Sequence, residues 1–253
     1  VGGRGGMSSV GCAKVIRRVR NDKSIKGVIL RVNSHGGDSV AFDELLHELK
    51  LLSAAKPLVV SMSDVAASGG YFISMTGDPV LSYPNTITGS IGIFGLIANF
   101  PDTLAKIGVH TDGVGTTPFA GAFDVRRVLD PKIASVIQSV IDKGYRDFIG
   151  NVAKARNKTP AEIDAIARGR VWSGSQAKER GLVDELGGLS DAAAAAAQAA
   201  NLGAGYHVRY VEKDLTFWEK LALDLNSQAL AGMVQSVNQA LEPTYSMPGL
   251  ALR

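Results

Sequence analysis

The first third of the chain alternates between two patterns of apolar side chains. Residues 26–32 form a near-continuous apolar run followed by a turn, which is typical of a strand buried on both faces. Apolar residues then recur at helical spacing over residues 40–54, which indicates an amphipathic helix. Residues 58–62 predict another buried strand. Strand, helix and strand in this order form a βαβ unit with a parallel sheet.

The rest of the chain predicts helices with short strands between them. We expect strands over residues 80–82 and 87–97 and an edge strand over residues 206–211. Helices are predicted over residues 12–19, 133–152, 160–168, 174–180, 192–202 and 216–241. No internal repeat and no long linker divides the sequence. We therefore expect one α/β domain over residues 1–241, with a core at about 12–200 and helical C-terminal additions, and a tail over residues 242–253.

Composition excludes several kinds of protein. The chain has 27 Lys and Arg against 24 Asp and Glu, and this net charge of +3 is too small to suggest a nucleic-acid partner. A single Cys excludes an internal disulfide and a Cys-rich zinc site. We expect neither a metal nor a cofactor.

Charge and apolar runs also bear on membrane contact. Eight basic residues and one acid lie within residues 1–31, which predicts a solvated helix face or, as the alternative, a contact with lipid or a partner. The longest apolar stretch, residues 91–98, has eight residues, whereas a spanning helix needs about 20. No signal peptide or spanning segment is therefore expected in this sequence.

The most informative segment surrounds Ser68. It follows a buried strand, has a small residue before it and is followed by Gly69 and Gly70. Such a turn can present the serine hydroxyl at the start of a helix, where free N–H groups favour the negative charge of a tetrahedral oxyanion. A tight turn that needs small residues only for packing is the structural alternative.

A second glycine pair, Gly36 and Gly37, follows the earlier strand. Because the carboxyl ends of parallel strands meet at one edge of a sheet, we expect the Gly37 N–H beside the Gly69 N–H. Two donors would then face one oxyanion. A helix-entry turn that needs glycine for a positive φ is the alternative.

Taken together, the motifs resemble the signal peptide peptidase A family, serine peptidases with a Clp/crotonase-like fold. The strings that carry the resemblance are RVNSHGG, VVSMSDVAASGGYFIS, TGSIGIFG, GVHTDGV and GRVWSGSQAKERGLVDELG, in the family's order over roughly residues 26–190. The resemblance implies that Ser68 is the nucleophile and that Gly69 with Gly37, or Gly36, forms the oxyanion hole. It also implies that Ser90 holds the amine of a catalytic Lys.

The expected Lys is missing. In the family's single-domain members it follows the segment that matches GVHTDGV, but residues 115–124 contain no Lys, and Lys106 and Lys132 are expected to be solvated. This pattern resembles the C-terminal, Ser-bearing half of the tandem-repeat form, in which the N-terminal repeat supplies the Lys. His35, where the family usually has Pro, could instead serve as the base or be an exposed loop residue.

The resemblance implies a serine endopeptidase that hydrolyses cleaved signal peptides and other apolar peptides. It further implies a homo-oligomer, anchored to the bacterial inner membrane through a segment outside this sequence, with the peptidase domain on the periplasmic side. Two alternatives stay open. One is a catalytically incomplete Clp-fold half that serves as an assembly partner, and the other is a crotonase-type acyl-CoA enzyme. The absence of any Glu near either glycine pair counts against the acyl-CoA enzyme.

Overall fold

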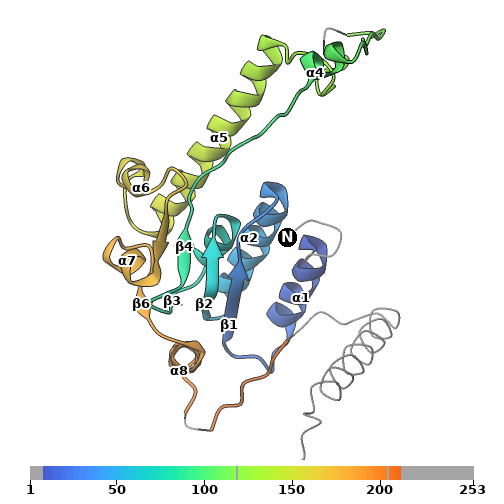
Figure 1. Cartoon of the computed structure of the whole chain (residues 1–253). Helices are drawn as coiled ribbons and strands as arrows, with labels where there is room; N and C mark the ends of the chain where they lie inside the picture. The colour runs from blue at the N-terminus through green and yellow to red at the C-terminus, as the bar shows by residue number, and fades with distance from the viewer. Residues whose placement is uncertain (1–7, 118, 204, 212–253) are drawn as a thin grey trace, which may run out of the picture. The chain divides into compact units, whose positions relative to one another are not determined.

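The computed structural model of the chain describes residues 8–117, 119–203 and 205–211 (Figure 1). Within these residues the strands are β1 (Val28–Ser34), β2 (Leu58–Ala67), β3 (Val80–Ser82), β4 (Ile87–Gly89), β5 (Val171–Ser173) and β6 (Glu185–Leu186). The helices there are α1 (Ser9–Asn21), α2 (Ser39–Ala55), α3 (Gly69–Ser74), α4 (Pro101–Lys106), α5 (Pro131–Ala155), α6 (Pro160–Ile166), α7 (Gly174–Glu179) and α8 (Leu189–Ala199). The predicted α/β class is confirmed.

The strand β2 is the centre of the sheet. It pairs in parallel with β1 along one side, and with β3 and then β4 along the other. Only β5 runs antiparallel to its neighbour, β4, among the strand pairs of the described residues. The predicted mainly parallel sheet and the βαβ unit β1–α2–β2 are therefore confirmed. The strand β2 continues past the predicted Met62 to Ala67, so it ends directly at Ser68.

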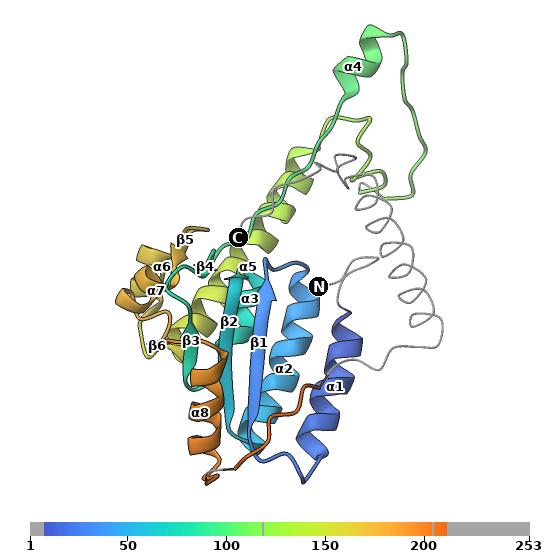
Figure 2. The ribbon, with the colours of Figure 1, turned by 60° about the horizontal axis from the view of Figure 1, so that its bottom comes forward.

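Alternate residues of β2 face two separate apolar clusters, as the period of a strand requires. Val60 and Met62 belong to a large core that includes Phe42 and Leu49 of α2. Val59 belongs to a smaller cluster with α8 residues. The helices α2 and α8 accordingly lie on opposite faces of the sheet (Figure 2).

Two strand predictions are wrong. The strand expected over residues 87–97 stops at Gly89, because Ser90 takes a φ of +49° that ends the extended conformation. The edge strand expected over residues 206–211 is irregular, and Arg209 instead holds this segment by donating to Asp22 at 2.9 Å. The helix predicted over 216–241 and the tail over 242–253 lie outside the described residues.

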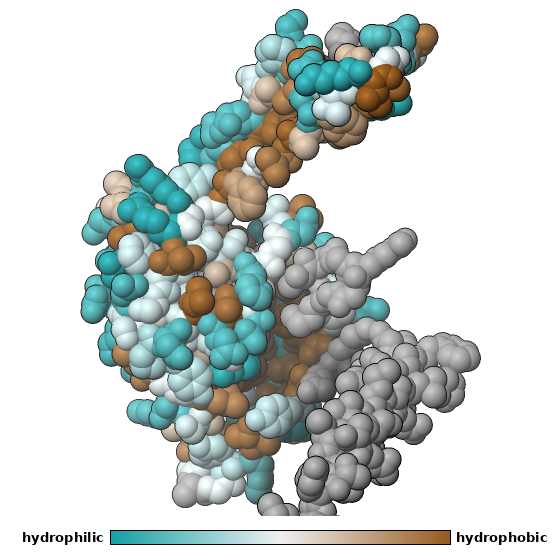
Figure 3. Space-filling view, viewed as in Figure 1, coloured by the Kyte–Doolittle hydropathy of each residue, from teal (hydrophilic) through white to brown (hydrophobic). Residues whose placement is uncertain are grey.

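After Ser90 the chain leaves the sheet and forms what we call the arm, residues 92–140. Its first part runs along α5 (Figure 1), where a Cβ at Gly95 would lie 3.1 Å from Ile141 Cδ1. Figure 3 shows apolar surface along this region. Large apolar side chains of the arm that are about two-thirds exposed or more include Phe94, Leu96, Ile107, Val114, Phe123, Val128 and Val140. The apolar face predicted for the long helix is thus exposed at Val136 and Val140, whereas Ile133 is buried.

Candidate active site

Ser68 occupies a strained turn between β2 and α3. Its φ of +53° and ψ of −118° lie outside the regions that residues with a side chain favour, at a cost of about 1–3 kcal/mol. Its N–H donates to Gly89 O at 2.9 Å, and its carbonyl accepts from the Phe72 N–H at 2.9 Å. Bonds on both sides therefore hold the serine in this conformation at the carboxyl edge of the sheet.

Gly36 of the first glycine pair lies against this turn. Gly36 has a φ of +106°, and a Cβ there would lie 2.9 Å from both Gly69 N and Ser68 Cβ. A Cβ at Gly70 would meet the carbonyl oxygen of Ser34, the last residue of β1. The ends of β1 and β2 therefore meet, and only glycine at position 36 permits this approach.

The backbone donors of the two pairs differ in their partners. The Gly36 N–H donates to Ser34 Oγ at 3.2 Å. Gly69 is the first residue of α3, where an N–H has no acceptor within the helix. Gly37 is exposed, with a φ of +151°. The predicted position of the Gly37 N–H beside the Gly69 N–H stays a prediction.

Ser90 lies at the end of the strand next to β2. Ala67 pairs with Gly89, so Ser68 and Ser90 each follow the same rung of the sheet. The Ser90 N–H donates to Arg170 O at 2.7 Å. Ser90 and Ser68, predicted from separate motifs, are therefore neighbours at the edge of the sheet, and both are half-buried.

The loop that holds Ser90 was not expected from the sequence. Arg168 and Gly169 have φ values of +58° and +72°, and the Gly169 N–H donates to Ile91 O at 2.9 Å. The only signal in the sequence is Gly169, which directly follows the helix predicted over residues 160–168. Its contact with the residue after Ser90 gives the GRVWSG string a position beside the candidate site.

The basic residues considered from the sequence lie on the surface. Lys106 in α4 and Lys132 in the first turn of α5 are exposed, and both belong to the arm. His35 is an exposed loop residue in the turn that carries Gly36. His47, His110 and His207 are exposed as well. None of these side chains is buried.

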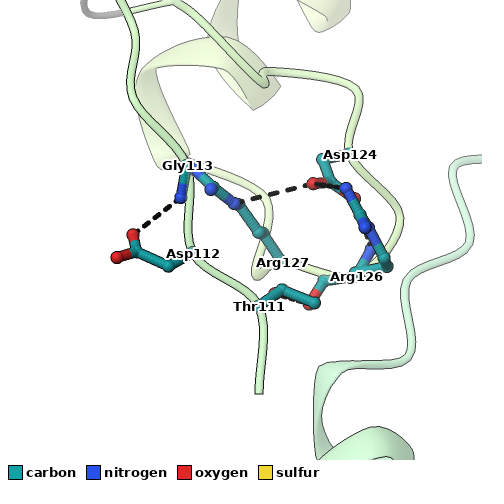
Figure 4. Close-up of polar contacts among 6 residues, drawn as sticks. All are labelled: Thr111, Asp112, Gly113, Asp124, Arg126 and Arg127. Carbon is teal, nitrogen blue, oxygen red and sulfur yellow. Dashed lines mark hydrogen bonds and ion pairs between the residues drawn. The ribbon is translucent and has the colours of Figure 1, made fainter. Parts of the chain in front are cut away.

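The Lys-free segment 115–124 ends in a surface ion cluster (Figure 4). Asp124 accepts from Arg126 Nε at 2.8 Å and Nη2 at 2.9 Å, and Arg127 Nε lies 3.6 Å away. The hydrogen bond from Arg126 lowers the pKa of Asp124 to about 2. Thr111 Oγ1 donates to the Arg126 carbonyl at 3.4 Å. The cluster therefore ties the two sides of this part of the arm together.

The described residues offer neither a metal site nor a membrane span. They contain no group of three His, Cys, Asp or Glu side chains placed to hold a metal ion. Among the helices of residues 8–117, 119–203 and 205–211, none has the length and apolar content that a membrane crossing requires.

Comparison with known proteins identifies the family. The model of peptidase family S49 matches residues 50–203. The chain is 43% identical to Protease 4 of Salmonella typhi, over 91% of this chain and 37% of that protein. It is 37% identical to the chloroplastic serine protease SPPA of Arabidopsis thaliana, over 78% of this chain and 29% of that protein. The chain spans about a third of the length of these relatives.

Among solved structures, a point mutant of ClpP1 from Listeria monocytogenes matches with a TM-score of 0.49 and 17% identity, over 74% of this chain and 88% of that one. The sequence relatives and the family model together give the assignment. The chain belongs to peptidase family S49.

Proposed function

We propose that this chain carries the nucleophile of a serine endopeptidase, and that the nucleophile is Ser68. The observation that carries the proposal is the strained Ser68 turn in contact with Gly36, at the sheet edge where α/β proteins bind their ligands. Strain of this kind persists only where the surrounding structure imposes it, and it concentrates at functional sites.

The proposed reaction uses the backbone of both glycine pairs. Ser68 Oγ gives its proton to a base and attacks the carbonyl carbon of the peptide. The carbonyl electron pair moves to the oxygen, and the Gly69 and Gly37 N–H groups donate to that oxyanion. Collapse of the intermediate expels the amine, which takes up the proton, and water then hydrolyses the acyl ester. Gly36 serves as the spacer that lets the loop approach Ser68.

We assign the base to a Lys of another repeat or of a neighbouring subunit. Residues 115–124 have no Lys, and Lys106 and Lys132 are exposed. An amine acts as a base near neutral pH when burial lowers its pKa. Ser90, beside Ser68, is placed to hold such an amine once it enters.

The substrates in this proposal are cleaved signal peptides and other apolar peptides. The assembly would be a homo-oligomer at the bacterial inner membrane, with this domain on the periplasmic side. The resemblance to signal peptide peptidase A supports the substrate class. The exposed apolar side chains of the arm support contacts with further subunits.

A non-catalytic role is the second candidate function. The absence of a base near Ser68 among the described residues favours a half-site that contributes only to assembly. The crotonase-type alternative has less support, because membership of a peptidase family accounts for the same paired glycines.

Covalent labelling separates these functions. The chain is treated with a fluorophosphonate probe, alone and mixed with a Clp-like repeat that carries a Lys, and the labelled peptide is identified by mass spectrometry. We expect weak labelling of the chain alone and strong labelling at Ser68 in the mixture. No labelling in either sample, with peptide hydrolysis unaffected by Ser68→Ala, would overturn the proposal.

Variants of the same preparation test the base and its partner. Ser90→Ala should lower turnover less than Ser68→Ala, because it disturbs only the position of the amine. Full activity of Ser90→Ala at every pH would remove Ser90 from the site. Strong hydrolysis by the chain alone that Lys106→Ala or Lys132→Ala abolishes would assign the base to this chain instead.

A further inference from the structure

The short helix that begins after Ser68 carries a fully buried tyrosine. Tyr71 is three residues from Ser68, and its side chain has no exposed surface. Its hydroxyl donates to the carbonyl oxygen of Leu182 at 2.9 Å. The helix α3 is therefore fixed to the segment that follows α7, which is 111 residues away in the sequence.

A charged pair joins the C-terminal end of α5 to Asp184, two residues after Leu182. The Arg156 side chain is only 6% exposed, and its Nη1 donates to both carboxylate oxygens of Asp184, at 2.9 and 3.0 Å. Asp184 Oδ2 also accepts from the N–H of Val80, the first residue of β3, at 2.7 Å. The pair therefore joins α5 to β3.

The rest of the Arg156 guanidinium is not satisfied. Nε and Nη2 are buried and have no hydrogen-bond acceptor among the described residues. Burying a charge without full compensation opposes folding, so an ion pair of this kind is weak support for stability alone. A functional role of the ion pair would therefore depend on the groups that it holds in position.

The ion pair is linked to the tyrosine through the segment 182–184. Asp184, the partner of Arg156, lies two residues after Leu182, whose carbonyl oxygen accepts from the Tyr71 hydroxyl. Burial raises the pKa of the Tyr71 phenol, and the charge of Arg156 opposes that rise. We call Tyr71, Arg156 and Asp184 the strut.

We propose that the strut positions Ser68, with Tyr71 and Arg156 as positioning residues that hold α3 and so keep the strained turn in its reactive conformation. The inference rests on the proposed role of Ser68. On the α2 side, the Phe42 ring packs where a Cβ of Gly69 would be. The strut supplies support from α5 and β3 instead. A strained conformation needs such support from several elements, and small displacements of a reacting group lower turnover strongly.

The test uses the preparation that hydrolyses peptides, whether the chain alone or the mixture with a Lys-bearing repeat. Tyr71→Phe removes only the hydroxyl, and Arg156→Lys keeps the charge but loses the planar fork. We expect either change to lower kcat and the rate of fluorophosphonate labelling at Ser68 about tenfold or more, with KM changed less than about twofold. Arg156→Met should lower both rates further than Arg156→Lys.

Glu48→Gln is the matched control, because Glu48 also has a 6% exposed side chain and pairs with Arg17 and Arg20 between α1 and α2. It should lower the melting temperature but leave kcat unchanged. If the strut variants also lower the melting temperature and leave kcat and the labelling rate unchanged, as this control does, the inference is overturned. Should Tyr71→Phe fail to fold, the two Arg156 variants decide. If the parent protein is not labelled, the proposed function itself is overturned. If the parent is labelled and Tyr71→Phe is labelled at the same rate, only the proposed role of the strut is overturned.

Discussion

The sheet edge around Ser68 and the arm use apolar residues in opposite ways. At the edge, the side chains of Phe42 and Tyr71 are almost completely buried, and Phe42 leaves no room for a Cβ at Gly69. On the arm, Leu96 is 87% exposed and Phe94 is 90% exposed. Apolar side chains are therefore packed around the Ser68 turn in one region and remain uncovered in the other.

This difference separates the part of the proposed site that the described residues form by themselves from the part that they do not. The Ser68 turn, Gly36 and Ser90 are brought together by contacts within the described residues. The arm presents an apolar surface that those residues do not cover, and contiguous apolar surface of this kind marks a contact site. It agrees with the proposal that the missing base and the further subunits come from outside this chain.

The largest expected effect is on the chemistry at the packed edge. Ser68→Ala in the active preparation should reduce peptide hydrolysis by at least about 10³-fold, because it removes the nucleophile. The free energy of unfolding should change by less than about 0.5 kcal/mol. Ser53→Ala, which changes an exposed serine of α2, is the control and should be fully active. A loss of only a few-fold in Ser68→Ala would exclude it as the nucleophile.

A matched pair of leucines compares the two regions directly. Leu49→Ala removes a side chain that is 1% exposed and should lower the free energy of unfolding by about 2–5 kcal/mol. Leu96→Ala makes the same change on the arm and should cost less than about 0.5 kcal/mol. Urea unfolding of both variants measures the difference. If Leu96→Ala lowers the free energy of unfolding by more than about 1 kcal/mol, the arm is covered in solution, and the difference in burial between the two regions is incorrect.

Two glycine substitutions test how tightly the edge is packed. A methyl group at Gly69 would overlap the Phe42 ring, so Gly69→Ala should cost about 1–3 kcal/mol. Gly150 lies within α5, and a Cβ added there would have no other atom within 4 Å. Gly150→Ala should therefore stabilise the protein by about 0.5–1 kcal/mol. Thermal unfolding compares the two variants. Equal stability would show that Phe42 can move away from Gly69.

The smallest expected effect lies on the arm and depends on pH. Because the folded-state pKa of Asp124 is about 2, below its ordinary value of 3.8, its ion cluster stabilises the fold above about pH 4. That contribution is lost as the pH falls through about 2, and it is small because the cluster is exposed. In Arg126→Gln the pKa of Asp124 should rise towards 3.8, which an NMR titration of its carboxyl group measures. An unchanged titration would exclude Arg126 as the cause.

The sequence predicted those parts of the fold that depend on local patterns. The βαβ unit follows from the apolar run at 26–32 and the helical spacing at 40–54. The capping box of Thr159 and Glu162 places the start of α6 correctly. The contact of Gly36 with Ser68 follows from a topological rule, because parallel strands end at the same edge.

Features that depend on distant contacts could not be predicted in this way. The strand expected over 87–97 fails because the apolar residues after Ser90 belong to the arm, and a run of apolar residues does not reveal which surface they face. The pairing of β4 with β5 joins Gly89 to Val171, far apart in the sequence. Arg156 and Asp184 carry no local pattern that would associate them with Tyr71.

The central position of β2 has a consequence for hydrogen exchange. This strand shares backbone hydrogen bonds with β1, β3 and β4, so its amides can open only when several strands separate. Those amides should exchange with deuterium through global unfolding, whereas the irregular stretch from Ile93 to Ile97 exchanges through local fluctuations. The serine at the end of β2 is thereby attached to the slowest-exchanging part of the domain, and the arm can adapt to whatever binds it while the geometry around Ser68 is retained.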